Sequence, residues 1–160
     1  MQVYITDLTQ ICNYDDLVNK LPYVDMVRYK SFTRGLRAKQ FLIAHSIKNK
    51  IANKFKYISI AHKDNIIIVG ASNKPIGIDI EDTSIKRDFD SLANFMGFSQ
   101  IKNQNDFYRA FTASEAHYKS SLPIDKSQEK FYKLNKYMIC IVSDTENIQW
   151  INTNLIPEQI

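Results

Sequence analysis

The chain has few of the residues that break or cross-link a polypeptide. Its 160 residues include only four glycines, four prolines and two cysteines. The shortage of glycine and proline excludes a collagen-like or linker-rich chain. A hydrophobic content of 44% with 24% charged residues excludes a disordered composition. Cys12 and Cys140 lie far apart without metal-binding spacing, so we expect both to be unpaired thiols in a reducing compartment.

Long hydrophobic runs are also absent. No apolar stretch approaches the roughly 20 residues that a membrane helix needs, and residues 1–5 form a short alternating stretch rather than a signal peptide. We therefore expect a cytoplasmic protein without a membrane partner. The formal charge of +4 is compatible with nucleic acid, a phosphorylated small molecule or an acidic protein as partner, and it selects none of them.

The hydrophobic pattern predicts an α+β protein. Short β-branched or alternating stretches predict strands at 2–6, 57–61, 66–69, 76–80, 137–142 and 148–151. Apolar residues at helical spacing predict helices at 15–21, 28–52, 85–97 and 104–121. The three central strands are expected to form an antiparallel meander, and Tyr118 to lie on the apolar side of the last helix. We expect one compact unit with an N-terminal half, 1–74, and a C-terminal half, 75–160.

Three carboxylates stand out as candidates for chemistry. Asp79 and Glu81 are two residues apart in a predicted strand, so they point to the same face. Alone, they are typical of a solvated strand end. Glu115 and Lys119 lie on one face of a predicted helix, where alone they indicate a surface ion pair. Jointly, the three acids form an all-oxygen cluster of the kind that Mg²⁺ prefers, together with phosphate oxygens of a substrate.

Basic residues accompany these acids. His62 ends the first of the central strands with Lys63 beside it. A lone histidine is most often structural, but at a strand-to-turn junction next to a lysine it is a candidate donor to a phosphate. The helix predicted at 28–52 carries Arg37 among many basic residues and is a candidate to hold further phosphates.

Two segments resemble the signature of the 4'-phosphopantetheinyl transferase superfamily. They are 76–81, Ile-Gly-Ile-Asp-Ile-Glu, and 111–119, Phe-Thr-Ala-Ser-Glu-Ala-His-Tyr-Lys. The signature is a Gly-Ile-Asp-x-Glu strand followed by an aromatic-Ser/Thr-x-Lys-Glu-Ala-x-x-Lys helix. Residues 59–62, Ser-Ile-Ala-His, are similar to the Asn-Ile-Ser-His of the longer, surfactin-synthetase-activating type, and 37–45 resembles an arginine-containing helix of the family. The resemblance covers roughly residues 28–155.

The resemblance implies two similar α+β halves with coenzyme A in the cleft between them. It implies that Asp79, Glu81 and Glu115 hold Mg²⁺ on the pyrophosphate of coenzyme A. The implied catalytic residues are Glu115, which takes the proton of the attacking serine, and Lys119, which stabilises the departing 3',5'-ADP. The residues implied to contact the coenzyme A phosphates are His62, Arg37, His45, Lys63 and Lys119.

The implied activity is transfer of the 4'-phosphopantetheine arm of coenzyme A to a serine of an apo acyl- or peptidyl-carrier protein. The partner is then an acidic carrier protein rather than nucleic acid, and the length of the chain predicts a monomer. The alternative is a catalytically impaired relative that binds coenzyme A or a carrier protein. The reason for this alternative is that the chain departs from the family signature, above all at Ser114, where the family has lysine.

Overall fold

Two four-stranded β-sheets organise the chain. The computed structural model describes residues 1–33, 35–99, 101–145, 147–151, 155 and 157–160. The first sheet has the order β2-β3-β1-β7 and consists of β1 (Gln2–Asp7), β2 (Tyr57–Lys63), β3 (Ile66–Ser72) and β7 (Gln149–Ile151). The second has the order β4-β6-β5-β8 and consists of β4 (Ile76–Asp82), β5 (Glu129–Leu134), β6 (Tyr137–Ser143) and β8 (Glu158–Gln159).

Helices cover the outer faces of both sheets. They are α1 (Asp15–Val18), α2 (Tyr23–Ser31), α3 (Leu36–Ile51), α4 (Phe89–Phe95) and α5 (Gln104–Ser120), with short 3-10 turns η1 (Leu8–Gln10) and η2 (Lys126–Gln128). The predicted α+β class is therefore confirmed. Within the described ranges, no helix combines the length and the apolar character needed to cross a bilayer.

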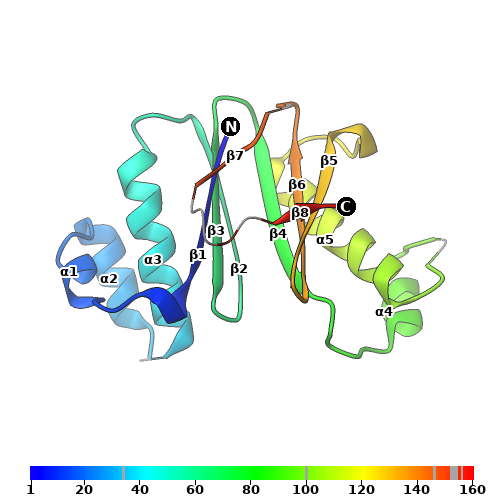
Figure 1. Ribbon diagram of the computed structural model, residues 1–160, viewed down its shortest axis with the longest axis horizontal. Coiled ribbons are helices and arrows are strands. Elements are labelled where there is room, and N and C mark those ends of the chain that lie inside the picture. The colour runs from blue at the N-terminus through cyan, green and yellow to red at the C-terminus, as the bar shows by residue number, and fades with distance from the viewer. Residues whose placement is uncertain (34, 100, 146, 152–154, 156) are drawn as a thin grey trace.

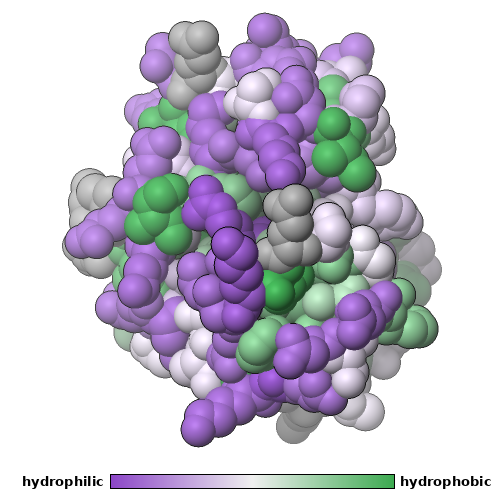
Figure 2. Space-filling model, turned by 90° about the vertical axis from the view of Figure 1, so that its right-hand side faces the viewer, coloured by the Kyte–Doolittle hydropathy of each residue, from purple (hydrophilic) through white to green (hydrophobic). Residues whose placement is uncertain are grey.

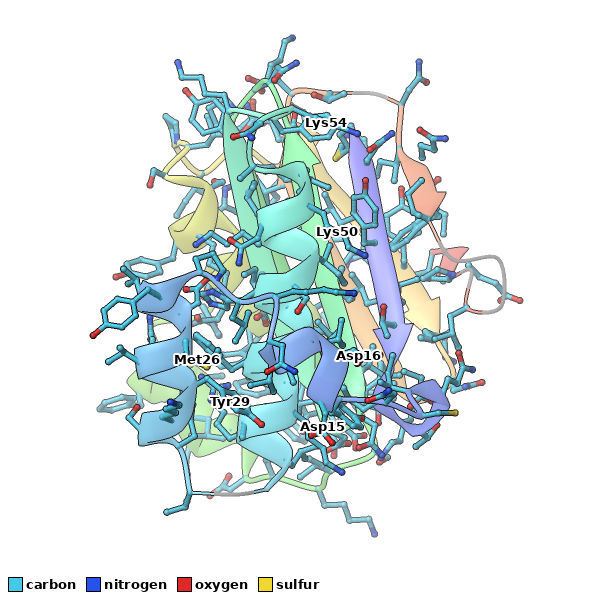
Figure 3. The ribbon with its side chains drawn as sticks, turned by 90° about the vertical axis from the view of Figure 1, so that its left-hand side faces the viewer. Asp15, Asp16, Met26, Tyr29, Lys50 and Lys54 are labelled. Atoms are coloured by element: carbon cyan, nitrogen blue, oxygen red, sulfur yellow. The ribbon has the colours of Figure 1, made fainter. Side chains whose placement is uncertain are left out.

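The elements stack in four layers, with α3, the first sheet, the second sheet and α5 following one another (Figure 1). Alternation along the strands divides the apolar residues among three cores. Val3, Ile5 and Ile78 belong to the core between the sheets, while other residues pack under α5 or under α3. Figure 3 shows the first sheet from outside, with α3 lying across it and α1 and α2 flanking one end of α3. The sheets thus pack directly against each other.

The same connectivity occurs in both halves. In the first, β1 is followed by α3 and then by the β2–β3 hairpin, and β1 pairs antiparallel with β3. In the second, β4 is followed by α5 and then by the β5–β6 hairpin, and β4 pairs antiparallel with β6. The C-terminal segment adds a further strand to each sheet, because β7 pairs with β1 and β8 with β5.

Three expectations about the elements were wrong. The helix predicted at 28–52 is two helices, because Phe32 takes an extended backbone and ends α2, and Gly35, with φ of 155°, precedes α3. The central strands do not form a meander, because β4 leaves the β2–β3 hairpin to pair with β6. Tyr118 is 84% exposed, because the buried side of the last turns of α5 carries Ala116, His117 and Ser120 instead.

Candidate functional site

The candidate site is built where α5 packs closely on β4. A Cβ atom at Gly77 would lie only 1.8 Å from the backbone oxygen of Ala116 and 2.7 Å from the backbone nitrogen of Ser120. Only glycine therefore lets the helix backbone rest on the strand at this point. Because side chains two residues apart share a face of a strand, Asp79 also points toward α5, where Lys119 meets it.

The edges of the two sheets meet beside this contact. β2 lies at one edge of the first sheet, and β4 lies at one edge of the second. The buried backbone N–H of Ile78 has no sheet partner on this side and donates instead to Ser59 Oγ at 2.9 Å. This hydrogen bond satisfies a donor that would otherwise be left unpaired between the sheets. The junction brings residues near the end of β2 next to the acidic face of β4.

Two lysines pair with Asp79 and Glu81 of β4. Lys119 Nζ donates to Asp79 Oδ1 at 2.7 Å and to the backbone oxygen of Ile78 at 3.1 Å. Lys63 Nζ lies 2.6 Å from Glu81 Oε2. The side chain of Lys119 is 29% exposed and that of Asp79 is 11% exposed. This ion pair is therefore partly shielded from solvent, where a charge interaction is stronger than at an open surface. The repulsion between the two acids is thereby reduced.

Asp79 still has an unsatisfied oxygen. Its Oδ2 is buried, and no hydrogen-bond partner among the described residues reaches it. Burial is the largest cause that raises the pKa of Asp79; Lys119 acts in the opposite direction, and the charges of Glu81 and Glu115 raise the pKa further. The two glutamates are therefore close enough to Asp79 to disfavour its ionisation. An added cation beside Oδ2 would relieve both the repulsion and the missing contact.

Cations gather at the neighbouring end of β2. Arg37, in the first turn of α3, contacts the ring of His62 through its guanidinium. Burial, and next the charge of Arg37, lower the pKa of His62 to about 4, and Lys119 and Lys63 act in the same direction. His62 is therefore neutral near pH 7. Together with Arg37 and the two lysines, it forms a group suited to an anion.

Whether the acids fit a divalent metal depends on which of them are available. No group of three or more His, Cys, Asp or Glu side chains within the described ranges is arranged to hold a metal ion. Glu81 and Asp79 each contact a lysine, whereas Glu115 makes no ion pair or hydrogen bond with the described residues. If Mg²⁺ binds here, Asp79 Oδ2 and the Glu115 carboxylate are the oxygens that would hold it, since Mg²⁺ commonly takes one or two carboxylates and fills its remaining positions with water or phosphate oxygens.

One predicted residue lies apart from this group. His45, in α3, contacts Asp25 of α2 through Nδ1 at 2.9 Å, and its ring stacks on Phe41 with 3.9 Å between centroids. Its contacts thus join α3 to α2. The structure brings the other predicted residues together, namely Arg37, His62, Lys63, Asp79, Glu81, Glu115 and Lys119.

Sequence reasoning missed Ser59 as a residue that positions the site. Its signal was visible, because it is the one serine in the otherwise apolar and aromatic run 57–61, at a position that faces the neighbouring sheet. No protein-family model matches the chain, and no match is found among curated proteins. The geometry of the site is therefore what bears on function.

Proposed function

We propose that the chain is a Mg²⁺-dependent 4'-phosphopantetheinyl transferase with the fold of that superfamily. It transfers the phosphopantetheine arm of coenzyme A to a serine of an acidic acyl- or peptidyl-carrier protein. The observation that carries the proposal is the buried Oδ2 of Asp79, which no described residue hydrogen-bonds, with two more carboxylates and three cations around it. This arrangement lies where two halves of like connectivity meet, the place that the resemblance assigns to coenzyme A.

The cations account for binding of a diphosphate. Arg37, Lys63 and Lys119 are positioned around His62, whose neutral ring offers one N–H donor. Charge-assisted hydrogen bonds to phosphate oxygens are among the strongest that side chains form. In this proposal Lys63 and Lys119 exchange their carboxylate partners for phosphate oxygens when coenzyme A enters. The exchange also frees Glu81 and Asp79 for the metal.

The proposed reaction is one displacement at phosphorus. The serine oxygen of the carrier forms a bond to the phosphorus that bears the pantetheine, and the bond from that phosphorus to the oxygen of 3',5'-ADP breaks with its electron pair. Glu115 accepts the serine proton, and Lys119 donates to the departing phosphate oxygen. Bound Mg²⁺ would supply neutralisation of the phosphate charge.

A non-catalytic binding module is the second candidate. It is favoured by the ion pairs of Asp79 with Lys119 and of Glu81 with Lys63, which occupy two of the three acids without a metal. A chain that needs no metal to neutralise its acids can hold the phosphates of coenzyme A by its cations alone. Such a module would bind coenzyme A equally well with and without Mg²⁺.

The test is a transfer assay read by intact mass. The protein, coenzyme A and Mg²⁺ are incubated with each apo carrier protein encoded in the same genome, and one added phosphopantetheine arm is the expected product. Asp79→Asn and Glu115→Gln should abolish transfer. Asp90→Asn, which removes an exposed acid in the first turn of α4, is the matched control and should leave transfer unchanged.

Absence of transfer to every carrier would reject the enzyme. Thermal unfolding then decides on the second candidate, because a ligand that binds only the folded state raises the unfolding temperature. A rise with coenzyme A that does not depend on Mg²⁺, and that is lost in Arg37→Gln, would support the module. No rise in any condition would reject both candidates.

A further inference from the structure

A concave surface lies beside α5, lined by residues outside the Asp79 group. It is a groove of about 750 Å³ between α5, the segment that precedes it and the start of β5. Its apolar lining includes Phe98, Ile101, Ala110, Ala113, Ile124 and Phe131. Figure 2 shows the molecule from the side of α4 and α5, where hydrophobic patches lie among hydrophilic side chains. The groove offers an apolar body of a ligand a place to bind.

The charges in the groove are unequally engaged. Asp106 accepts the backbone N–H of Lys102 at 3.1 Å, and Glu129 Oε1 lies 3.1 Å from His117 Nε2. Arg109 and Lys126 make no ion pair with the described residues. The guanidinium of Arg109 instead lies over the ring of Phe131, 3.8 Å from its centroid. Both acids of the groove thus have hydrogen-bond partners, whereas the side chains of Arg109 and Lys126 remain available to an anion.

A buried histidine in the lining provides a second, independent observation. His117 lines the groove and is only 5% exposed. Its Nε2 faces Glu129, but its Nδ1 has no hydrogen-bond partner among the described residues. A buried polar atom without a partner destabilises the protein until a ligand or water satisfies it. Because Nε2 faces Glu129, Nδ1 is the ring nitrogen that a polar group in the groove can satisfy.

We propose that this groove binds a small amphiphilic carboxylate, such as a medium-chain aliphatic acid. The chain of the acid lies against the apolar lining, and its carboxylate reaches Arg109 and Lys126 at the edge. Apolar walls with a few convergent polar groups are typical of small-molecule sites. The site is independent of the proposed transferase chemistry, because Arg109, Lys126 and His117 take no part in the Asp79 group.

The probe is octanoate, measured by calorimetric titration, with 1-octanol as the uncharged comparison. The unmodified protein should bind octanoate more tightly than octanol. The double variant Arg109→Gln/Lys126→Gln should weaken octanoate about tenfold, because it removes charge-assisted hydrogen bonds, and should leave octanol unchanged. Lys30→Gln/Lys50→Gln, which removes the same two positive charges at exposed positions of α2 and α3, is the control and should leave both affinities unchanged.

Two single substitutions test the groove itself. Ala110→Phe fills it and should abolish binding of both probes, while Ser114→Lys adds a cation to the lining and should tighten octanoate alone. Urea unfolding checks that each variant folds. If Ala110→Phe does not fold, the variants that change charge decide whether octanoate binds in the groove. The proposal is overturned if octanoate does not bind at millimolar concentration, or if its affinity is the same in the charge variants as in the unmodified protein.

Discussion

Replacing Gly77 by alanine is the sharpest test of how the site is positioned. The new Cβ would lie 1.8 Å from the oxygen of Ala116, and real Cβ contacts are essentially never shorter than 3.0 Å. The obstructing atoms belong to the backbone of α5, so the helix must move away from β4 by on the order of 1 Å. We expect a loss of about 3 kcal/mol, the upper end for overpacking. With a urea dependence of roughly 2 kcal/mol per molar, the unfolding midpoint should fall by about 1.5 M.

Gly70→Ala is the matched control. It is also a strand glycine, but its Cβ would meet the tips of Ile78 and Ile76 side chains at 2.2 and 2.8 Å, and these can rotate away. We expect a smaller loss of about 1 kcal/mol, partly offset by the reduced freedom of the unfolded chain. Equal midpoints for the Gly77 and Gly70 variants would refute the idea that α5 rests on β4 through its backbone.

Three further experiments test other residues of the site. Ser59→Ala removes the acceptor for the buried N–H of Ile78 and should reduce the free energy of unfolding by about 2 kcal/mol in urea titrations, whereas no loss would mean that the two strands hold together without it. Lys119→Met leaves Asp79 without its cation and should destabilise by about 2 kcal/mol, and adding Asp79→Asn should restore part of the loss in a double-mutant cycle; purely additive effects would contradict the pair. Folding lowers the pKa of His62 from its ordinary 6.5 to about 4, so between these pH values the unfolded chain binds a proton that the folded chain does not. The contribution of His62 to stability is therefore fully present above pH 6.5 and is lost as the pH falls from 6.5 to 4. His62→Gln should flatten this part of the stability profile, and an unchanged slope would contradict the lowered pKa.

The strands could be predicted from the sequence because their signal is local. Strands 57–63, 66–72 and 76–82 consist of β-branched runs separated by turn residues, and each forms where the pattern places it. Which strand pairs with which is not local information. β4 is buried on both faces, between the other sheet and α5, so its pattern does not distinguish a third meander strand from the first strand of a new sheet. The strand β5 was missed because Lys130 and Lys133 interrupt its apolar residues.

The acidic members of the site could also be predicted, since spacing alone places Asp79 and Glu81 on one face. The partners of these acids could not. That Lys63 reaches Glu81 depends on β2 and β4 being adjacent edges of different sheets, which no short-range pattern specifies. His45 was assigned by its place in a helix resembling that of a family, whereas its position relative to Asp25 depends on the break between α2 and α3.

The repeated connectivity makes the difference between the two halves informative. In the first half, α3 packs on β3 and β2 rather than on β1, the strand that corresponds to β4. In the second half, α5 packs directly on β4, and Gly77 lets the two backbones meet. Because the helix backbone comes this close, a lysine one turn beyond Glu115 can reach a carboxylate of the strand and remove it from solvent. The different position of the two helices on their sheets therefore explains why the acidic group forms on β4 and has no counterpart among the described residues of β1.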